Sequence, residues 1–335
     1  MASSAIDIHT HIVPASFPAY AGRHANVRWP SMAPGHDCRH CNVMIAGKVF
    51  RTVTDECWSI ERRLEAMKVS RIERQVLSPM PELLSYWMEP EDAQAMGRYV
   101  NDTIATMVED GAGRFAGLGM VPLQDPERAA RELERMMKTG KFRGVEIGTN
   151  VNGVSIADQR FESFFQAAEE LGAAVFVHAL HPAGVDRLIG PPAMPALVAF
   201  PCETAITIAS LMMGGMLRRH PKLRIAFSHG GGVFALVLPR LMHGWKNMKE
   251  LKEKVQSPAE QARKLYYDTL VYDSKTLAFL IERFGVTQLC LGTDHPFTIQ
   301  ETDPVGAVEV LGLDVREQNL LMFANASRFL GEGVA

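Results

Sequence analysis

Four histidines and one aspartate stand at the ends of short apolar segments in this 335-residue chain. His9 and His11 lie in Ile-Asp-Ile-His-Thr-His, where alternate side chains of a strand point the same way. His178 ends Val-Phe-Val-His, His229 ends Ala-Phe-Ser-His, and Asp294 ends Leu-Gly-Thr-Asp. Zinc binds imidazole and carboxylate ligands, and a catalytic zinc site keeps one position open. The pattern predicts one Zn²⁺, or another divalent metal, per subunit.

Each of these residues has a simpler interpretation when it is taken alone. A histidine at a strand end more often makes a structural hydrogen bond than a metal bond, and Asp294 could cap the next helix. The prediction rests on the joint pattern, because four or five such residues at separate strand ends would rarely arise by chance.

The surrounding sequence predicts how these residues are held together. Helices are expected over residues 91–109, 126–138, 160–171, 204–219 and 274–284. Short apolar segments that alternate with them are expected to be strands, over residues 5–13, 73–80, 115–123, 143–148, 173–180, 223–229, 265–272 and 288–293.

Eight alternating strands predict a parallel sheet, and the chain length favours closure into a (β/α)₈ barrel of one domain, residues 1–335. An open doubly wound sheet is the main alternative, although no Gly-x-Gly-x-x-Gly follows the first strand. Residues 22–57 are too many for an ordinary loop, so we expect an insertion over the barrel mouth. In such a barrel, the polar strand ends meet at that mouth.

Three further charged residues are candidates for the site. Arg51 and Arg240 could each bind a carboxylate through two parallel hydrogen bonds, although a surface salt bridge is the more common role of an arginine. Glu146, in Gly-Val-Glu-Ile-Gly, could face the barrel interior. A buried carboxylate there would need a metal, a cation or a proton.

The expected insertion also contains a group of potential metal ligands. Cys38 and Cys41 have Cys-x-x-Cys spacing, which can bind zinc, and His36 and His40 are nearby. A structural zinc site usually has a second ligand pair, and none with suitable spacing follows. Solvated loop residues are the alternative.

Composition narrows the possible partners. The net charge is −3, so no basic field suggests binding to nucleic acid or an anionic membrane. We expect no membrane span, because no run approaches about 18 apolar residues, and no signal peptide at residues 1–6. Five scattered cysteines argue against a disulfide framework and predict a cytoplasmic protein.

The sequence resembles the amidohydrolase superfamily and, within it, the aminocarboxymuconate-semialdehyde decarboxylase group. The resemblance runs over nearly the whole chain. Its anchors are Asp7-Ile-His-Thr-His11, Gly47-Lys-Val-Phe-Arg51, Cys57-Trp58, Leu77-Ser-Pro-Met-Pro81, Ser85-Tyr-Trp87, Pro90-Glu-Asp92, His178, Pro201-Cys-Glu-Thr204, Met213-Gly-Gly215, His220-Pro-Lys-Leu223, Ser228-His-Gly-Gly-Gly232, Arg240, His243-Gly-Trp245 and Leu291-Gly-Thr-Asp-His-Pro-Phe297.

The resemblance assigns roles to these residues. It implies that a single zinc is bound by His9, His11, His178 and Asp294, with His229 as the acid/base residue beside it. It also implies that substrate carboxylates are held by Arg51 and by Arg240 of a neighbouring subunit in a homodimer.

The implied reaction is the non-oxidative, metal-dependent decarboxylation of a small unsaturated carboxylate. Hydrolysis or hydration of a related ring-cleavage product is the alternative, since the same metal site could perform it. A non-catalytic regulator is a third possibility, against which the intact ligand set argues.

The sequence departs from the group around the expected pocket. Ala196 stands where the group has a tryptophan, and Ala183 where it has an aromatic residue. His295 replaces a tyrosine and Glu146 a common glutamine. These departures leave the predicted ligands intact and predict a relaxed or shifted substrate preference.

Overall fold

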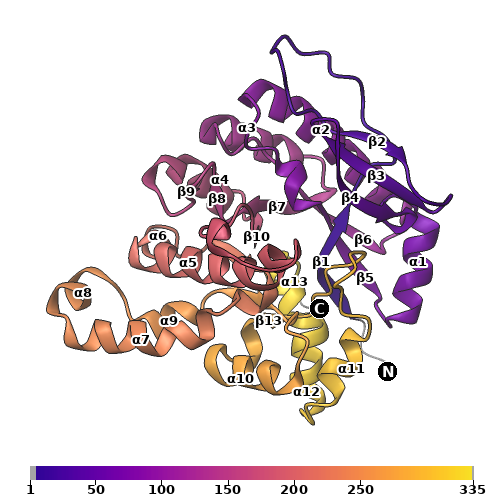
Figure 1. Cartoon of the computed structure of the whole chain (residues 1–335). Helices are drawn as coiled ribbons and strands as arrows, with labels where there is room; N and C mark the ends of the chain where they lie inside the picture. The colour runs from indigo at the N-terminus through magenta and orange to yellow at the C-terminus, as the bar shows by residue number, and fades with distance from the viewer. Residues whose placement is uncertain (1–4, 334–335) are drawn as a thin grey trace.

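Eight parallel strands form the centre of the molecule in a computed structural model that describes residues 5–333 (Figure 1). They lie in the order β1-β5-β6-β7-β10-β11-β12-β13. The sheet closes where the Ile8 N–H donates to the Leu291 carbonyl at 2.9 Å and where Thr10 pairs in parallel with His295. The strands are β1 (Ile6–Ile12), β5 (Arg74–Pro79), β6 (Phe115–Gly119), β7 (Phe142–Gly148), β10 (Ala174–His178), β11 (Arg224–Phe227), β12 (Tyr266–Asp268) and β13 (Leu289–Cys290).

The fold is therefore the predicted (β/α)₈ barrel, and each of its strands lies within or beside an expected segment. Most of the strands are shorter than expected; β11 and β13, for example, end before His229 and Asp294, which lie in the loops of the mouth. The expectation that residues 1–6 contain no signal peptide concerns residues that lie mostly outside the described part of the chain.

Helices surround the barrel. They are α1 (Ile60–Val69), α2 (Pro90–Asp110), α3 (Pro126–Met137), α4 (Glu162–Glu170), α5 (Phe200–Met213), α6 (Met216–Arg219), α7 (Phe234–Asn247), α8 (Lys249–Lys254), α9 (Pro258–Ala262), α10 (Ser274–Phe284), α11 (Pro304–Glu309), α12 (Val315–Asn319) and α13 (Asn325–Phe329). The expected helix over residues 204–219 is wrong as a single element, because it breaks between α5 and α6. Gly215 adopts a positive φ of 76° at the break, a conformation that glycine accepts without strain.

A three-stranded antiparallel sheet lies between β1 and α1 in the sequence, inside the segment expected as an insertion. Its strands are β2 (Ser31–Pro34), β3 (His40–Ile45) and β4 (Lys48–Thr54). The sheet sits to one side of the barrel near α1 and α2 (Figure 1). Arg51 lies on β4 opposite Val43 of β3, so this sheet positions one of the two candidate arginines.

The barrel interior is filled from below by apolar side chains. Ile6, Ile8 and Phe176 belong to one buried cluster with Phe329 of α13, so the C-terminal helix helps to close the lower end. Above this layer, the register of β1 against β5 shifts between Asp7 and Thr10. Such bulges re-aim side chains beside active sites, and this one lies where the two histidines of β1 begin.

The segment Pro195–Met213 is long and apolar enough to cross a membrane by length and composition, so the expectation that no run approached that length was wrong. It comprises a π-helical turn, η5 (Pro195–Ala199), and α5. In the structure, Thr204, Ile208 and Leu211 of this segment are buried, and α5 packs against α7. These contacts place it in the helical wall of the barrel.

Candidate metal centre at the barrel mouth

The structure brings together the four predicted ligands. One potential ligand atom from each of His9, His11, His178 and Asp294 lies within 4.8 Å of the others, and all four residues are buried. The Nε2 atom of His11 is 3.0 Å from Asp294 Oδ1, and the Nε2 atom of His9 is 3.4 Å from the same oxygen. These residues come from β1, the end of β10 and the loop after β13, which share one end of the barrel.

Hydrogen bonds fix the tautomer of all three histidines. The Nδ1 atom of His9 lies 2.6 Å from Asp268 Oδ2, that of His11 lies 3.0 Å from the Pro79 carbonyl, and that of His178 lies 2.9 Å from the Ala179 carbonyl. These partners are acceptors, so each Nδ1 carries the hydrogen and each Nε2 has a free lone pair. This arrangement is typical of metal-binding histidines.

The charges at the site also favour a cation. Burial lowers the pKa of His11 and places that of His178 well below its usual value, which favours the neutral form of both imidazoles. At His9 the effect of burial is outweighed by the Asp268 carboxylate, which raises the pKa. Burial opposes the ionisation of Asp294, but the nearby imidazoles of His11 and His9 hold its pKa well below the usual range. Asp294 Oδ1 accepts no hydrogen bond. The Nε2 atoms of His9 and His11 lie 3.1 Å apart and both approach Asp294 Oδ1, and a divalent metal fits this donor set.

The sequence reasoning missed Asp268, which ends β12 and is fully buried. Its Oδ2 accepts hydrogen bonds from the His9 ring and, at 2.9 Å, from the His229 backbone N–H. Its Oδ1 accepts from the Gly230 N–H at 2.7 Å. One carboxylate therefore orients a candidate ligand and the turn that carries His229. The available signal was its place at a strand end, the same signal that identified His178.

His229 stands beside the cluster with an unused ring nitrogen. Its ring centroid lies 5.3 Å from that of His9 and 5.0 Å from that of His178, and its buried Nδ1 has no hydrogen-bond partner. Its φ of 56° is unfavourable for a non-glycine residue, and the two backbone bonds to Asp268 hold it there. Burial lowers the pKa of His229 to about 4, so at neutral pH the imidazole is a free base.

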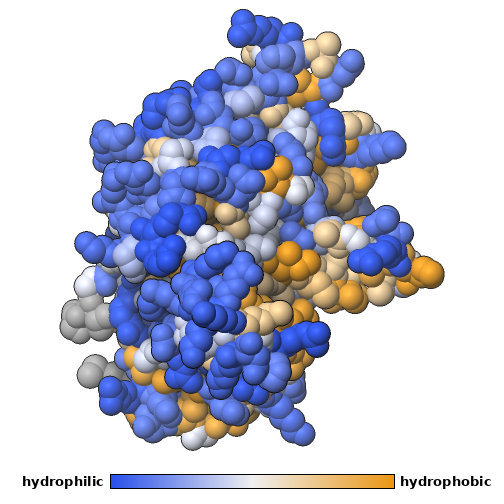
Figure 2. All heavy atoms as spheres, turned by 90° about the vertical axis from the view of Figure 1, so that its left-hand side faces the viewer, coloured by the Kyte–Doolittle hydropathy of each residue, from blue (hydrophilic) through white to orange (hydrophobic). Residues whose placement is uncertain are grey.

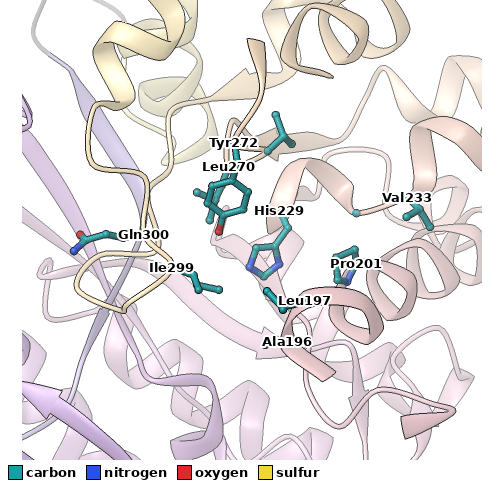
Figure 3. A pocket seen from close by; sticks show the side chains of 11 residues that line it. Ala196, Leu197, Pro201, His229, Val233, Leu270, Tyr272, Ile299 and Gln300 are labelled. Carbon is teal, nitrogen blue, oxygen red and sulfur yellow. The ribbon is translucent and has the colours of Figure 1, made fainter. Parts of the chain in front are cut away.

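An apolar cavity of about 550 Å³ opens next to His229. Figure 3 shows the His229 ring pointing into it, among side chains of the η5 turn, the β12 loop and the loop after β13. Ala196, one of the departures expected from the resemblance, lines this cavity. Ala183 is not among the lining residues, and its backbone N–H donates to Glu203 at 3.0 Å.

The two candidate arginines occupy different places. The Arg51 guanidinium lies 4.3 Å from the ring centroid of Phe297, which stacks on His11 at 5.0 Å, and 3.6 Å from Glu82. It therefore reaches the mouth. Arg240 is exposed on α7, and its guanidinium makes no hydrogen bond or ion pair with another described residue. Figure 1 shows α7 and α8 projecting away from the barrel.

Two departures from the resembling group lie beside the cluster. Glu146 faces the interior, as considered above, with Oε2 3.7 Å from His11 Nδ1. Burial and the nearby carboxylates of Asp294 and Glu82 raise its pKa well above the usual value, which favours the protonated form. His295 is buried, with Nδ1 2.9 Å from the Gln300 side-chain oxygen, and burial lowers its pKa to about 3.

Comparison with known families agrees with this geometry. The amidohydrolase family matches residues 6–331. The chain belongs to this family. It is 36% identical to the 2-amino-3-carboxymuconate-6-semialdehyde decarboxylase of Dictyostelium discoideum over 332 residues, which covers 97% of this chain and 91% of the relative. This amidohydrolase is therefore a member of the group that the sequence resembles.

Solved structures share the fold of this amidohydrolase. The apo form of the Metarhizium anisopliae protein described as IDCase is 22% identical with a TM-score of 0.83, and the match covers 98% of this chain and 97% of that one. A dihydroxybenzoic acid decarboxylase from a Polaromonas species, solved with bound manganese and 2-nitroresorcinol, is 24% identical with a TM-score of 0.74. That match covers 81% of this chain and 85% of the other.

Proposed function

We propose that this amidohydrolase is a metal-dependent, non-oxidative decarboxylase of a small unsaturated or aromatic carboxylate. The observation that carries the proposal is the pairing of two features at one mouth. A buried cluster of His9, His11, His178 and Asp294 supplies a cation site, and His229 offers a free base beside it. The 36% identity to a named decarboxylase supports the same reaction class.

A bound divalent metal supplies Lewis-acid polarisation of the substrate. Loss of carbon dioxide breaks the carbon–carbon bond to the carboxylate and leaves its electron pair on the substrate, where a conjugated carbonyl or aromatic system delocalises it. A proton must then reach that carbon. His229 is the residue placed to take up a proton and deliver it. The sum is one carboxylate and one proton converted to carbon dioxide and a C–H bond, without an oxidant.

Substrate binding follows from the cavity and Arg51. Leu197, Val233, Leu270 and Ile299 give the cavity an apolar lining that suits a planar unsaturated or aromatic body. Arg51 stands at the mouth and can hold a carboxylate through its planar guanidinium. Because Ala196 leaves room where an aromatic residue was expected, the preference is relaxed or shifted relative to the resembling group.

Zinc is the ion we propose, at one per subunit. Three imidazoles and one carboxylate form a donor set that suits zinc, whereas carboxylate and water ligands suit manganese better. The manganese in the Polaromonas structure makes that ion the first comparison. Apoprotein reconstituted with each ion in turn should turn over substrate faster with zinc, and faster turnover with manganese would overturn the choice of ion alone.

We also propose a homodimer in which Arg240 enters the partner's site. Leu236 and Arg240 are four positions apart on α7, so they share a helix face, and Leu236 is 71% exposed. Leu197 and Ile206, on the neighbouring η5 and α5, are also exposed. Figure 2 shows hydrophobic atoms at the right-hand edge and along the bottom of an otherwise mostly hydrophilic side. Exposed apolar residues beside an unpaired arginine are features of a protein interface.

Complementation tests this arrangement. Arg240→Ala and His229→Ala proteins, each inactive alone, should regain activity when mixed, because one site of the heterodimer then carries neither change. No recovery in a verified heterodimer would place Arg240 outside the partner's site.

We expect the protein in the cytoplasm, where its five free cysteines would stay reduced.

Carbon dioxide release from a substrate panel tests the proposed reaction. The panel pairs unsaturated acyclic dicarboxylates and hydroxybenzoates with neutral amides and lactones of similar size. We expect carbon dioxide from the carboxylates at the same rate with and without oxygen. Turnover of the neutral amides or lactones alone would instead identify a hydrolase and refute the proposal.

A further inference from the structure

A second group of metal-binding side chains lies in the turn between β2 and β3, away from the barrel cluster. One potential ligand atom from each of His36, Asp37 and His40 lies within 4.8 Å of the others. The Nε2 atom of His36 is 3.6 Å from Asp37 Oδ2, and the Nδ1 atom of His40 is 2.6 Å from Asp37 Oδ1. The two imidazole centroids are 4.0 Å apart. We call this group the hairpin cluster.

The backbone of the turn builds this cluster. The Gly35 N–H donates to the His40 carbonyl at 2.9 Å, and a Cβ at position 35 would lie 2.4 Å from that oxygen. Only glycine permits this approach, which brings His36 against His40. The Arg39 N–H donates to Asp37 Oδ1 at 2.8 Å and holds the carboxylate within reach of both rings. The turn is therefore folded around its three polar side chains.

We propose that the hairpin cluster is a second metal site, for a borderline divalent cation of the zinc class. Two imidazoles and a carboxylate are ligands that zinc prefers, at distances of about 2.0–2.2 Å. Tetrahedral ligands at those distances stand roughly 3.4 Å apart. The His36–Asp37 separation of 3.6 Å is close to that value, and the 2.6 Å hydrogen bond between His40 and Asp37 would lengthen when both bind the ion. The thiols of Cys38 and Cys41, which the sequence suggested as a ligand pair, are not members of the cluster.

The position of this site indicates a structural role. An ion there would join the end of β2 to the start of β3, and β3 pairs with β4, on which Arg51 lies. The members of the hairpin cluster are exposed or of intermediate burial, and both of its imidazoles belong to the proposed ligand set. The ion would therefore stabilise the sheet that carries Arg51, and it would take no part in the reaction.

Metal stoichiometry tests the proposal with tag-free protein. Wild-type protein and a His36→Ala/His40→Ala variant are equilibrated with Zn²⁺, freed of unbound ion by gel filtration, and analysed for zinc. We expect the variant to contain one ion fewer per chain. The matched control is His24→Ala, since His24 lies in the same insertion and pairs with Asp92 at 2.8 Å outside the cluster. This control should keep the full complement.

The His178→Ala change distinguishes the barrel ion from the hairpin ion. If both sites exist, His178→Ala protein loses only the barrel ion. The triple variant His36→Ala/His40→Ala/His178→Ala then contains no ion. A folded His36→Ala/His40→Ala protein with as much zinc as wild type would refute the hairpin site and leave the proposed function intact. As a second measurement, Zn²⁺ should raise the melting temperature of His178→Ala protein but not that of the triple variant, because a ligand stabilises only a fold that binds it. An equal shift in both would also refute the site.

Discussion

The barrel cluster and the hairpin cluster contain the same kinds of side chain in contrasting surroundings. In the barrel, each imidazole is held through Nδ1 by a group outside the cluster, and all four residues are buried. In the hairpin, Asp37 itself is the partner of both imidazoles, and the residues are largely open to solvent. Partners outside the barrel cluster leave the Nε2 lone pairs free and directed toward one point. In the hairpin cluster, the hydrogen bond between Asp37 and an imidazole must break before both can bind a metal.

The surroundings also differ in what they offer a substrate. An apolar cavity and the free Nδ1 of His229 adjoin the barrel cluster, where low exposure to water strengthens electrostatic effects. The hairpin cluster adjoins Arg39, whose guanidinium is paired with Asp55 at 3.2 Å. Ligand chemistry alone therefore does not separate a catalytic from a structural site. The difference lies in fixed lone pairs, an adjacent cavity and a free acid/base residue.

The largest expected effect follows from removing a barrel ligand. His178→Ala should lose the barrel ion and turnover together, because a buried imidazole of the cluster cannot be replaced by water without loss of geometry. Elemental analysis and carbon dioxide release measure the two losses. The matched change in the hairpin, His40→Ala, should spare the barrel ion. Retention of both ion and activity by folded His178→Ala protein would contradict the assignment.

A change at His229 tests whether this residue is a metal ligand or an acid/base residue beside the barrel cluster. We expect His229→Ala to keep its barrel ion and to lose turnover by about 10²-fold or more, as is typical when a general acid/base residue is removed. Zinc content is measured on the same sample as kcat. Joint loss of ion and activity would make His229 a ligand, and near-normal turnover would return it to a structural role.

A change at Asp268 tests how much the hydrogen-bond partner of the His9 ring contributes to metal binding. Asp268→Asn keeps the shape of the side chain but replaces one acceptor oxygen by a donor, so it should weaken the hold on the His9 ring. We expect metal affinity to fall by about 10–100-fold, in line with other changes to groups that orient metal ligands. Competition with a chelator measures the affinity. Unchanged affinity would mean that β1 alone fixes His9.

A smaller effect concerns acid sensitivity of the metal-free protein. Burial places the pKa of His178 well below its usual value, so between pH 6.5 and 5 the unfolded chain binds a proton that the folded chain does not. The free energy of unfolding must then fall as the pH falls. We expect this group to account for a loss of up to about 2 kcal/mol over that range.

Denaturant titrations of apoprotein at the two pH values measure this loss. It should be smaller in His178→Ala and unchanged in His36→Ala, which removes an exposed histidine. Equal acid sensitivity of wild type and His178→Ala would show that burial of His178 does not depress its affinity for protons.

Much of the barrel site could be predicted because its strands have recognisable sequence patterns. Alternation in β1 put His9 and His11 on one face, and a run of apolar residues before His178 or Asp294 marked a strand end. Asp268 has the same signal in Tyr-Tyr-Asp, but a single carboxylate with no ligand spacing around it was easily passed over.

The insertion was less accessible to sequence reasoning. The pairing of β2, β3 and β4 depends on contacts between strands whose polar residues give no clear alternation. The Cys-x-x-Cys spacing suggested Cys38 and Cys41 as the relevant pair, whereas Cys41 lies on β3 and the turn gathers His36, Asp37 and His40.

The break between α5 and α6 was also missed, because Gly214 and Gly215 sit inside an otherwise continuous helical pattern.

Reconstitution of metal-free protein tests the central claim most directly. Apoprotein is titrated with Zn²⁺, and carbon dioxide release from a carboxylate substrate is followed anaerobically, in wild type and in the His36→Ala/His40→Ala variant. The variant isolates the barrel cluster, so its activity should rise linearly and level off at one ion per chain. Full carbon dioxide release by protein that contains no metal would contradict the account.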